Sequence, residues 1–561
     1  MMHPGRVLAT VLASLALAGV QGIMAQEVIW VLNAPNPVNT AFGASVAPGG
    51  DLDGDGHADV LIGEDAASPV GLPFAGRVHA FSGGTAMPLF TVNGSSPNDA
   101  LGGIVKSVGD FDGDGVPDVG AVAFGGEYLR VFSGATTGVL QTVGGSGIRS
   151  FAGLGDVDGD GVGDLVAGFP FFSPTLAIPF GGETWVVSGG SGVILFSYQG
   201  SVSWQMVGRT VAHAGDLNGD GVPDVLVGAP TFYPTFAVSG GFVTAYSGAT
   251  GGALYSVSPN PAGGDGFGIS LDGGRDVTGD GIPDFIVGAP FLGFNSGAGY
   301  VYDGSDGTLV YFVNVVSPTQ EMLGGWVALT GDVNVDGRED FLIAGADSFG
   351  GPPADFRVGV FSGSSAQEIL VIVVPGLASG FKPDVKGAGD VNADGFADVV
   401  VGIVPSGPAL GWVTIYSGAP IGVTRFGSAC PGSGGPAPAI GATGIPVVGS
   451  TFEVHLSGAL GGTTAGLIVG ASKTDWWGVP LPWNLALLGM PGCELLVSVD
   501  FIAFASTSGS GPGTGSATLG FTIPALPSLV GTNVHAQWYV VDPGPTLLPG
   551  AMTGALKIVI Q

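Results

Sequence analysis

Residues 50–63 read GDLDGDGHADVLIG, in which aspartates at positions 51, 53, 55 and 59 surround a glycine-rich turn that leads into an apolar segment. Carboxylates this close together repel one another and raise one another's pKa, unless solvent screens them or a cation binds among them. The pattern recurs seven times, starting at Asp51, Asp110, Asp156, Asp216, Asp276, Asp332 and Asp390. Successive starts lie 46 to 60 residues apart, and such a period indicates a repeat architecture. We number these segments aspartate loops one to seven.

The sequence around each loop predicts four short strands. Apolar and polar residues alternate in each segment, and Gly, Asp, Asn and Ser separate the segments, which favours antiparallel pairing. One four-stranded sheet cannot bury both of its faces, whereas sheets stacked radially can. We therefore predict an all-β fold, a seven-bladed β-propeller followed by a small C-terminal β-sandwich. The strand that closes the ring is either EVIWVLNA (27–34) or GVTRFG (422–427), and the sequence leaves both open.

Composition and the N-terminus indicate an exported protein with cationic partners. The chain has 561 residues and a formal net charge of -31, with 14 Lys and Arg against 45 Asp and Glu, which argues against nucleic-acid binding. Arg6, the apolar run at 7–20 and IMA at 23–25 predict a signal peptide, and no later segment resembles a transmembrane helix. The predicted division is a signal peptide at 1–25, a propeller at 26–422 and a sandwich at 423–561. We expect a secreted, extracellular or cell-envelope location, where Cys430 and Cys493 would pair as a disulfide.

The aspartate loops are candidate calcium sites, up to seven in number. Side chains at positions one, three, five and nine can turn toward one centre, the carbonyl of residue seven can fill a gap, and the glycine at position six allows the sharp turn. Calcium prefers such hard oxygen ligands, and an all-protein cage suits it better than magnesium. The candidate metal ligands, with residue seven acting through its backbone carbonyl, are Asp51, Asp53, Asp55, His57 and Asp59; Asp110, Asp112, Asp114, Val116 and Asp118; Asp156, Asp158, Asp160, Val162 and Asp164; Asp216, Asn218, Asp220, Val222 and Asp224; Asp276, Thr278, Asp280, Ile282 and Asp284; Asp332, Asn334, Asp336, Arg338 and Asp340; and Asp390, Asn392, Asp394, Phe396 and Asp398.

Two other interpretations of these loops are less favoured. An EF-hand would need a glutamate at position twelve and flanking helices, and the sequence has neither. Metal-free Asp-Gly turns are common in hairpins, but seven copies with side chains at the same four positions favour metal binding. The number of negatively charged ligands in a loop should determine how tightly that loop binds calcium. Loop five, with Thr278 beside Arg275, is expected to bind most weakly.

The repeats resemble FG-GAP repeats, the blades of the integrin alpha-subunit propeller, which also occur in many bacterial secreted proteins. The motifs that carry the resemblance are FG at 42–43 and 267–268 and GAP at 228–230 and 288–290. The resemblance covers roughly 26–420. It implies calcium in the hairpin between the first two strands of a blade, and partner binding on the opposite face. It does not transfer the integrin's ligand.

Two aromatic clusters lie outside the repeated motif. Loops after the second strand of repeats three and four contain Phe171, Phe172, Phe232, Tyr233 and Phe236, which either pack between neighbouring loops or form an exposed recognition patch. In the C-terminal region, which resembles a terminal module of large secreted bacterial proteins, the segment TDWWGVPLPWN (474–484) holds three tryptophans. Core packing is the favoured role for them, ahead of sugar stacking. A third option is that this region is a sorting or attachment domain, and the sequence does not discriminate among the three.

No catalytic motif is present in the sequence. There is no HExxH, G-x-S-x-G or P-loop pattern, and the six histidines are scattered. We expect a calcium-binding adhesion or interaction scaffold for an extracellular protein or polysaccharide, and not an enzyme. The alternative is a calcium-dependent polysaccharide lyase with a basic residue in the central groove, for which Lys106, Arg130 and Arg149 are candidates without a shared pattern.

Overall fold

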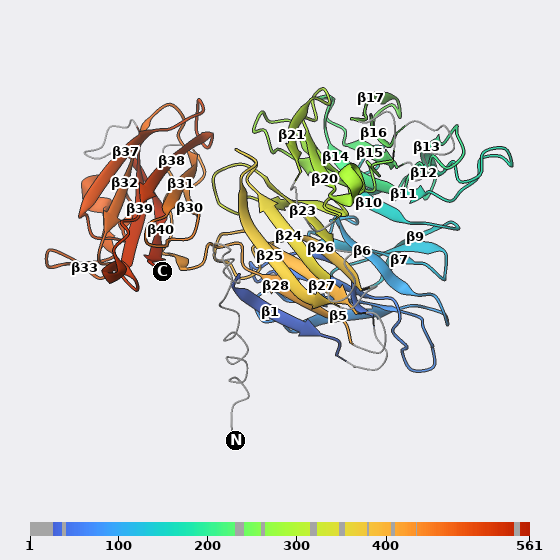
Figure 1. Ribbon diagram of the computed structural model, residues 1–561, viewed down its shortest axis with the longest axis horizontal. Coiled ribbons are helices and arrows are strands. Elements are labelled where there is room, and N and C mark those ends of the chain that lie inside the picture. Colours follow the sequence, from blue (N-terminus) through green and yellow to red (C-terminus); the bar gives the residue numbers. More distant parts are fainter. Residues whose placement is uncertain are drawn as a thin grey trace, which may run out of the picture.

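The computed structural model describes residues 26–35, 41–230, 240–259, 264–314, 322–346, 354–377, 381–405, 410–432, 435–542 and 550–561. The predicted signal peptide therefore lies outside the described residues. The described residues are almost entirely β-structure, arranged as a ring of sheets with a second group of sheets beside it (Figure 1). None of the helices in these ranges is long and apolar enough to cross a membrane.

Seven four-stranded antiparallel sheets form the ring, and we number them one to seven after their aspartate loops. In hydrogen-bonded order their strands are β2 (Phe42–Gly50), β3 (Asp59–Glu64), β4 (Arg77–Phe81) and β5 (Pro88–Asn93); β6 (Leu101–Gly109), β7 (Asp118–Ala123), β8 (Tyr128–Phe132) and β9 (Val139–Gly144); β10 (Ser150–Gly155), β11 (Asp164–Phe169), β12 (Glu183–Val187) and β13 (Ile194–Gln199); β14 (Thr210–Gly215), β15 (Asp224–Ala229), β16 (Phe242–Tyr246) and β17 (Ala253–Val257); β18 (Ser270–Arg275), β19 (Asp284–Ala289), β20 (Ala298–Tyr302) and β21 (Leu309–Val313); β22 (Trp326–Gly331), β23 (Asp340–Ala346), β24 (Ala354–Phe361) and β25 (Glu368–Leu377); and β26 (Lys382–Gly389), β27 (Asp398–Val404), β28 (Trp412–Tyr416) and β1 (Val28–Asn33).

The sheets close into a propeller. Each innermost strand contacts the innermost strand of the next sheet, from β2 to β6, β10, β14, β18, β22 and β26, and β26 contacts β2 again. Strand β1 pairs with β28 in sheet seven, with Val31 opposite Thr414. The segment at 27–34 therefore closes the ring, and the rival at 422–427 forms β29 (Val423–Phe426) of the C-terminal sheets instead. The predicted β-propeller is confirmed.

Burial follows position within each sheet. The second strands of sheets one to five, such as β3 and β15, are buried at every residue, and β23 and β27 at all but the last, because neighbouring sheets cover both faces. Neighbouring sheets approach very closely at glycines. A Cβ added to Gly63 would lie 2.0 Å from the carbonyl oxygen of Gly102 in sheet two, and the same relation joins Gly288 to Gly324. These second-strand glycines are thus required by sheet packing.

The C-terminal sheets enclose a separate core around Trp538. A five-stranded and a three-stranded sheet share one buried cluster, in which Trp538 is fully buried and its indole N–H donates to the carbonyl of His455 at 2.9 Å. The expected disulfide between Cys430 and Cys493 is present. The strands are β29, β40 (Gly550–Val559), β39 (Asn533–Val541), β32 (Thr464–Gly470) and β37 (Phe501–Ser506); β30 (Ala439–Thr443), β31 (Thr451–Ala459) and β38 (Gly515–Thr522); with the short pairs β33 (Asp475–Trp476) and β34 (Val479–Pro480), and β35 (Trp483–Asn484) and β36 (Glu494–Leu495). The short helices are α1 (Leu292–Asn295), η2 (Ala486–Leu488) and η3 (Pro527–Leu529).

The two aromatic clusters predicted from the sequence differ in how far their side chains are buried. Trp476 and Trp483 lie partly buried near the disulfide with ring centroids 6.4 Å apart, whereas Trp477 is 90 % exposed. Core packing therefore accounts for two of the three tryptophans. Phe171 and Phe172 are exposed, and the other three aromatic residues of the predicted patch lie outside the described residues.

Candidate metal centres

All seven aspartate loops connect the first strand of a sheet to its second strand, which places them on one face of the propeller. The glycine at position six has φ between 84° and 93° in every loop, as the pattern predicts. The aspartate at position one fixes this turn. In loop one, Asp51 Oδ1 accepts from the N–H of Gly54 at 2.8 Å and Oδ2 accepts from the N–H of Gly56 at 3.0 Å.

Loops one to three bring three carboxylates together. Oxygen atoms of the aspartates at positions one, three and nine lie within 4.8 Å of one another in each of these loops. The members are Asp51, Asp53 and Asp59; Asp110, Asp112 and Asp118; and Asp156, Asp158 and Asp164. In each group the first two side chains are exposed and the third is buried. Such oxygen clusters fit a hard divalent cation.

The aspartate at position five lies outside these three groups and supports the turn. Asp55 Oδ1 accepts from the N–H of His57 at 2.9 Å, and equivalent bonds occur in the other loops. The side chain of His57 is engaged elsewhere, since its Nδ1 lies 2.9 Å from the carbonyl oxygen of Val391 in loop seven. The prediction assigns only its backbone carbonyl as a candidate ligand.

The aspartate at position nine links two hairpins in every sheet. In sheet two, Asp118 Oδ2 accepts from the N–H of Phe111 at 2.7 Å, and Oδ1 accepts from the N–H of Gly134 at 2.9 Å. The same two bonds recur in all seven sheets. Burial raises the pKa of Asp59 to about 6 and that of Asp284 to about 6, while these backbone bonds lower it. A bound cation would favour the ionised form further.

Sequence reasoning missed the second end of this link. The ninth aspartate accepts this second hydrogen bond from the N–H of a glycine. That glycine belongs to the Ser-Gly or Asp-Gly pair directly after the third strand, and it has no room for a side chain. A Cβ at Gly134 would lie 2.0 Å from the carbonyl oxygen of Pro117, and one at Gly363 would lie 2.0 Å from that of Glu339. Such a pair follows the third strand of every sheet, 16 to 25 residues after the ninth aspartate, and this recurrence was the available signal.

Loops six and seven lie against the C-terminal sheets. Val335 of loop six and Phe396 of loop seven belong to the same buried cluster as Trp538. Position four of these loops holds Val335 with φ of 58° and Ala393 with φ of 54°, where loops one to five have glycine. A β-branched residue rarely adopts this conformation, so its packing must compensate for the strain.

The electrostatics of loops six and seven differ from those of the exposed loops. Burial, with a smaller effect of Asp336, raises the pKa of Asp332 to about 7, and burial raises that of Asp398 to about 8. Arg425 Nη1 donates to the carbonyl of Gly395 at 2.9 Å and its guanidinium stacks over Phe396. In these loops, asparagine at position three donates its amide to the aspartate at position five.

Loop five also has a nearby arginine. A Cβ added to Gly279 would lie 2.0 Å from Nη1 of Arg338, and Arg275 forms an ion pair with Glu339 at 3.2 Å. A guanidinium at this position competes electrostatically with a bound cation.

Comparison with known proteins identifies the repeats. The model of the FG-GAP repeat matches residues 42–81, 207–249 and 267–302, in sheets one, four and five. Human integrin alpha-7 is 37 % identical over 141 residues, which cover 23 % of this chain and 11 % of the integrin. Integrin alpha-5 of Xenopus laevis is 28 % identical over 218 residues, covering 35 % of this chain and 20 % of that protein.

A crystal structure of BBS1N in complex with ARL6DN, soaked with lead, aligns with 69 % of this chain and 97 % of that chain, with a TM-score of 0.41 and 11 % identity. The aligned region of this chain spans only a small part of each integrin, 11 % and 20 % of their lengths. The chain thus contains FG-GAP repeats in an integrin alpha-like propeller.

Proposed function

We propose that this FG-GAP, integrin alpha-like propeller is a secreted, calcium-binding scaffold for adhesion or interaction outside the cytoplasm. The observation that carries the proposal is the clustering of three carboxylates within 4.8 Å in each of loops one to three. Similarity to integrin alpha subunits supports an interaction role. The disulfide and the predicted signal peptide support an oxidising, extracellular compartment.

Calcium acts here as a structural element. Ion binding at a loop would neutralise repulsion among its aspartates and would hold the hairpin between the first two strands. We expect the tightest binding in loops one to three, which have four aspartates each, and the weakest in loops five to seven, which have fewer aspartates and a nearby guanidinium or a covering domain. Partners bind on the opposite face, away from the ions.

Calorimetric titration of chelator-treated protein with calcium tests the metal assignment. We expect several ions to bind, with magnesium binding far more weakly because it needs near-octahedral geometry and retains its waters. The variant Asp112→Asn should abolish one tight site. The matched control Asp475→Asn removes the same charge from an exposed aspartate of the C-terminal sheets and should change nothing. Absence of calcium binding would show that the loops are metal-free turns and would contradict the metal assignment.

A binding screen tests the scaffold role. The full chain is applied to panels of extracellular proteins and polysaccharides, with and without calcium. Calcium-dependent binding without chemical change supports a scaffold. Release of unsaturated sugar ends would instead establish the alternative, a polysaccharide lyase.

A further inference from the structure

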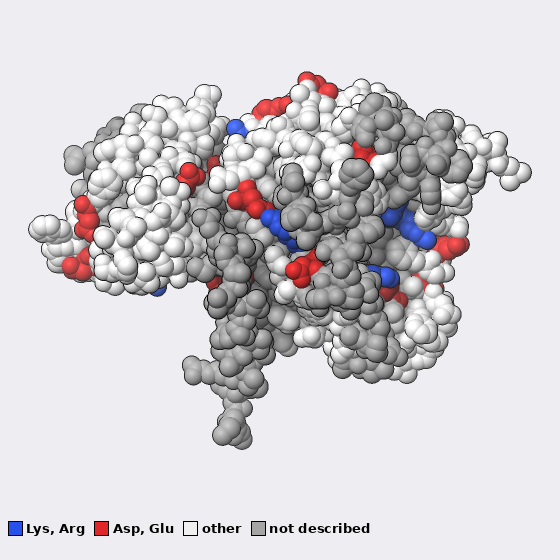
Figure 2. Space-filling view, viewed as in Figure 1, with Lys and Arg blue, Asp and Glu red and all other residues white. Residues whose placement is uncertain are grey.

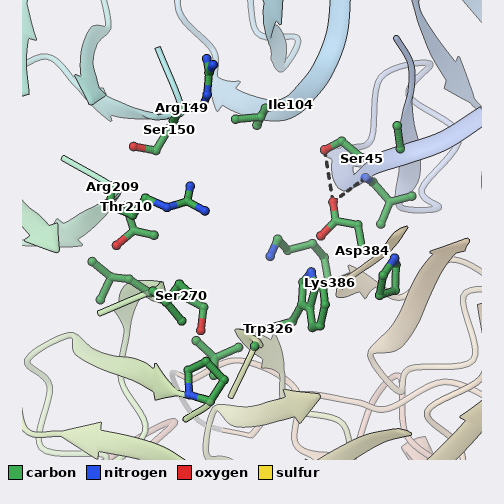
Figure 3. Close-up of a pocket in the computed structure, with 18 of the residues that line it drawn as sticks. Ser45, Ile104, Arg149, Ser150, Arg209, Thr210, Ser270, Trp326, Asp384 and Lys386 are labelled. Carbon is green, nitrogen blue, oxygen red and sulfur yellow. Dashed lines mark hydrogen bonds between the residues drawn. The ribbon is translucent and has the colours of Figure 1, made fainter. Parts of the chain in front are cut away.

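A cavity of about 650 Å³ occupies the centre of the propeller (Figure 3). The innermost strands of all seven sheets contribute to its walls. The lining residues lie near the starts of these strands and, as with Pro290 and Ala346, near the ends of second strands. Since the aspartate loops join the ends of first strands to the starts of second strands, the cavity lies toward the opposite face of the ring.

Four basic side chains line this cavity. They are Lys106, Arg149, Arg209 and Lys386, in a chain with only 14 Lys and Arg. Figure 3 shows the side chains of Arg209 and Lys386 pointing toward the middle of the cavity from opposite sides. On the visible face of Figure 2, Lys and Arg side chains lie toward the middle of the propeller. Four of the 14 Lys and Arg residues of this strongly acidic protein therefore line one cavity.

The basic residues occupy repeated positions in the sheets. Arg149 and Arg209 both lie one residue before a first strand, β10 and β14, in neighbouring sheets. Lys106 and Lys386 both lie three residues before the glycine that faces the ninth aspartate, Gly109 and Gly389. Lys106 and Arg149 do not share a position with each other, but each repeats the position of a second basic residue of the cavity. Arg130 lies elsewhere, stacked on Tyr128.

The positive charges are not neutralised within the described part of the chain. None of the four takes part in the ion pairs found there. Asp384 is the one carboxylate among the described lining residues, and its Oδ2 accepts from Ser45 Oγ at 3.2 Å and from the N–H of Val46 at 2.9 Å. Asp272, which also acts on Lys106, accepts from the N–H of Leu329 at 3.0 Å.

Confinement makes the protonated forms unfavourable. Burial, with a smaller effect of Lys386, lowers the pKa of Lys106 to about 8, although Asp272 and Asp384 oppose this shift. Burial and the neighbouring Arg149 lower the pKa of Arg209. An anion in the cavity would relieve both effects.

The remaining polar groups favour a ligand that also carries hydroxyls. Ser150 Oγ, Thr210 Oγ1 and Ser270 Oγ each donate to a glycine carbonyl of the next sheet, at 2.9, 2.8 and 2.7 Å. Their lone pairs are left to accept hydrogen bonds from a ligand. Trp326 adds a flat apolar wall of the kind that stacks on sugar rings. Acidic peptide side chains would supply the charge but not the hydroxyl donors.

We propose that the central cavity binds an acidic saccharide, the uronate or sulfated end of a polysaccharide chain. The inference rests on the proposed function and names a partner class for it. The volume suits a ligand of one to three sugar units, within the range of about 300 to 1,000 Å³ common for such sites. The carboxylate or sulfate groups meet Lys106, Arg209 and Lys386, while Arg149 stacks over Phe124 and Phe171 at the cavity wall. The sugar hydroxyls donate to the three side-chain oxygens.

Calorimetry with trigalacturonate as the probe and maltotriose as the neutral control tests this proposal. We expect the acidic trisaccharide to bind and the neutral one not to bind. The double variant R209Q/K386Q should weaken binding about a hundredfold, because each of the two lost charged hydrogen bonds typically accounts for about tenfold or more. The control K473Q/K557Q removes the same charge from the C-terminal sheets and should leave binding unchanged.

A second variant guards against misfolding. R209K/K386R keeps both charges and should retain most of the affinity if charge is the cause, and melting curves of all variants report on the fold. Failure of trigalacturonate and of a sulfated trisaccharide to bind the wild-type protein would overturn the proposal. Binding of triglutamate in preference to both saccharides would overturn it as well, as would equal binding by wild type and R209Q/K386Q.

The same samples distinguish this inference from the proposed function. Calcium titration and the extracellular-protein screen are repeated with R209Q/K386Q. Loss of saccharide binding with normal calcium binding locates the saccharide at the cavity. Normal calcium and protein binding in a wild-type chain that ignores acidic saccharides would reject the cavity proposal and leave the scaffold role intact.

Discussion

Aspartate loops two and six have nearly the same sequence pattern and different surroundings. In loop two, Asp110 and Asp112 are exposed, and with Asp118 they form an oxygen cluster. In loop six, Val335 packs into the core of the C-terminal sheets, and Asn334 is buried beneath them. A motif suited to holding a cation is therefore also a docking surface for a neighbouring domain. The two loops differ at position three, Asp112 against Asn334, at position four, Gly113 against Val335, and in what covers them.

The largest expected loss of stability comes from replacing the ninth aspartate, and it applies to both loops. Replacing the ninth aspartate leaves two buried N–H groups without acceptors in Asp118→Ala and three in Asp340→Ala, at about 1 to 3 kcal/mol each. We expect either variant to lose about 3 to 5 kcal/mol of unfolding free energy, measured by denaturant titration in chelator. Asp112→Ala, at the exposed third position, should change stability by less than about 1 kcal/mol under the same conditions. A large loss in only one loop would show that the link is not common to all sheets.

Calcium binding should stabilise the protein through loop two and not through loop six. Saturation to one hundred times the dissociation constant stabilises a folded protein by about 2.7 kcal/mol per site. Asp112→Asn should remove one such contribution from the calcium-induced rise in melting temperature. Asp336→Asn in loop six should leave the rise unchanged even where the variant itself is less stable. A calcium response lost equally in both variants would contradict the distinction.

Position four tests the docking role. Val335→Gly removes a buried side chain, at about 1.5 to 3 kcal/mol, and relieves backbone strain of about 1 to 2 kcal/mol. A net loss of about 1 kcal/mol is expected. Ala393→Gly relieves similar strain at an exposed position of loop seven, so its stability should stay equal or rise slightly. Both values come from denaturant titration, and a stabilising Val335→Gly would mean that the C-terminal contact contributes little.

Arg425 gives the smallest expected effect. Arg425→Gln removes a hydrogen bond to Gly395 and a positive charge near Asp390 and Asp394, at about 0.5 to 1 kcal/mol without metal. The same change should strengthen calcium binding at loop seven several-fold, visible as an added weak phase in calorimetry. Calcium binding identical to that of the wild type would show that the C-terminal sheets, and not Arg425, limit the calcium affinity of loop seven.

Much of the architecture follows from local sequence signals. The repeat period predicts the sheets, the glycine at position six has the predicted positive φ, and the segment at 27–34 has the pattern of an outer strand that closes the ring. These features depend on short segments and on strand pairing, which sequence patterns encode directly.

The missed features depend on contacts between distant segments. The bond from Asp118 to Gly134 joins two hairpins, and the burial of Val335 depends on strands that begin only at Ala439. Lys106 and Lys386 lie in sheets two and seven, so only ring closure brings them to one cavity. No local pattern in a single sequence reports such proximity.

Strand β1 has a consequence for how the molecule assembles. Its partner β28 is the last strand of the ring to be synthesised, so the N-terminal segment must wait for the rest of the propeller before it can pair. Pairing over such a long sequence separation is slow, and ring closure is the expected late step of folding. Until then β28 presents an open sheet edge that another chain can occupy. A protein clipped after residue 33 would therefore tend to associate with its own copies.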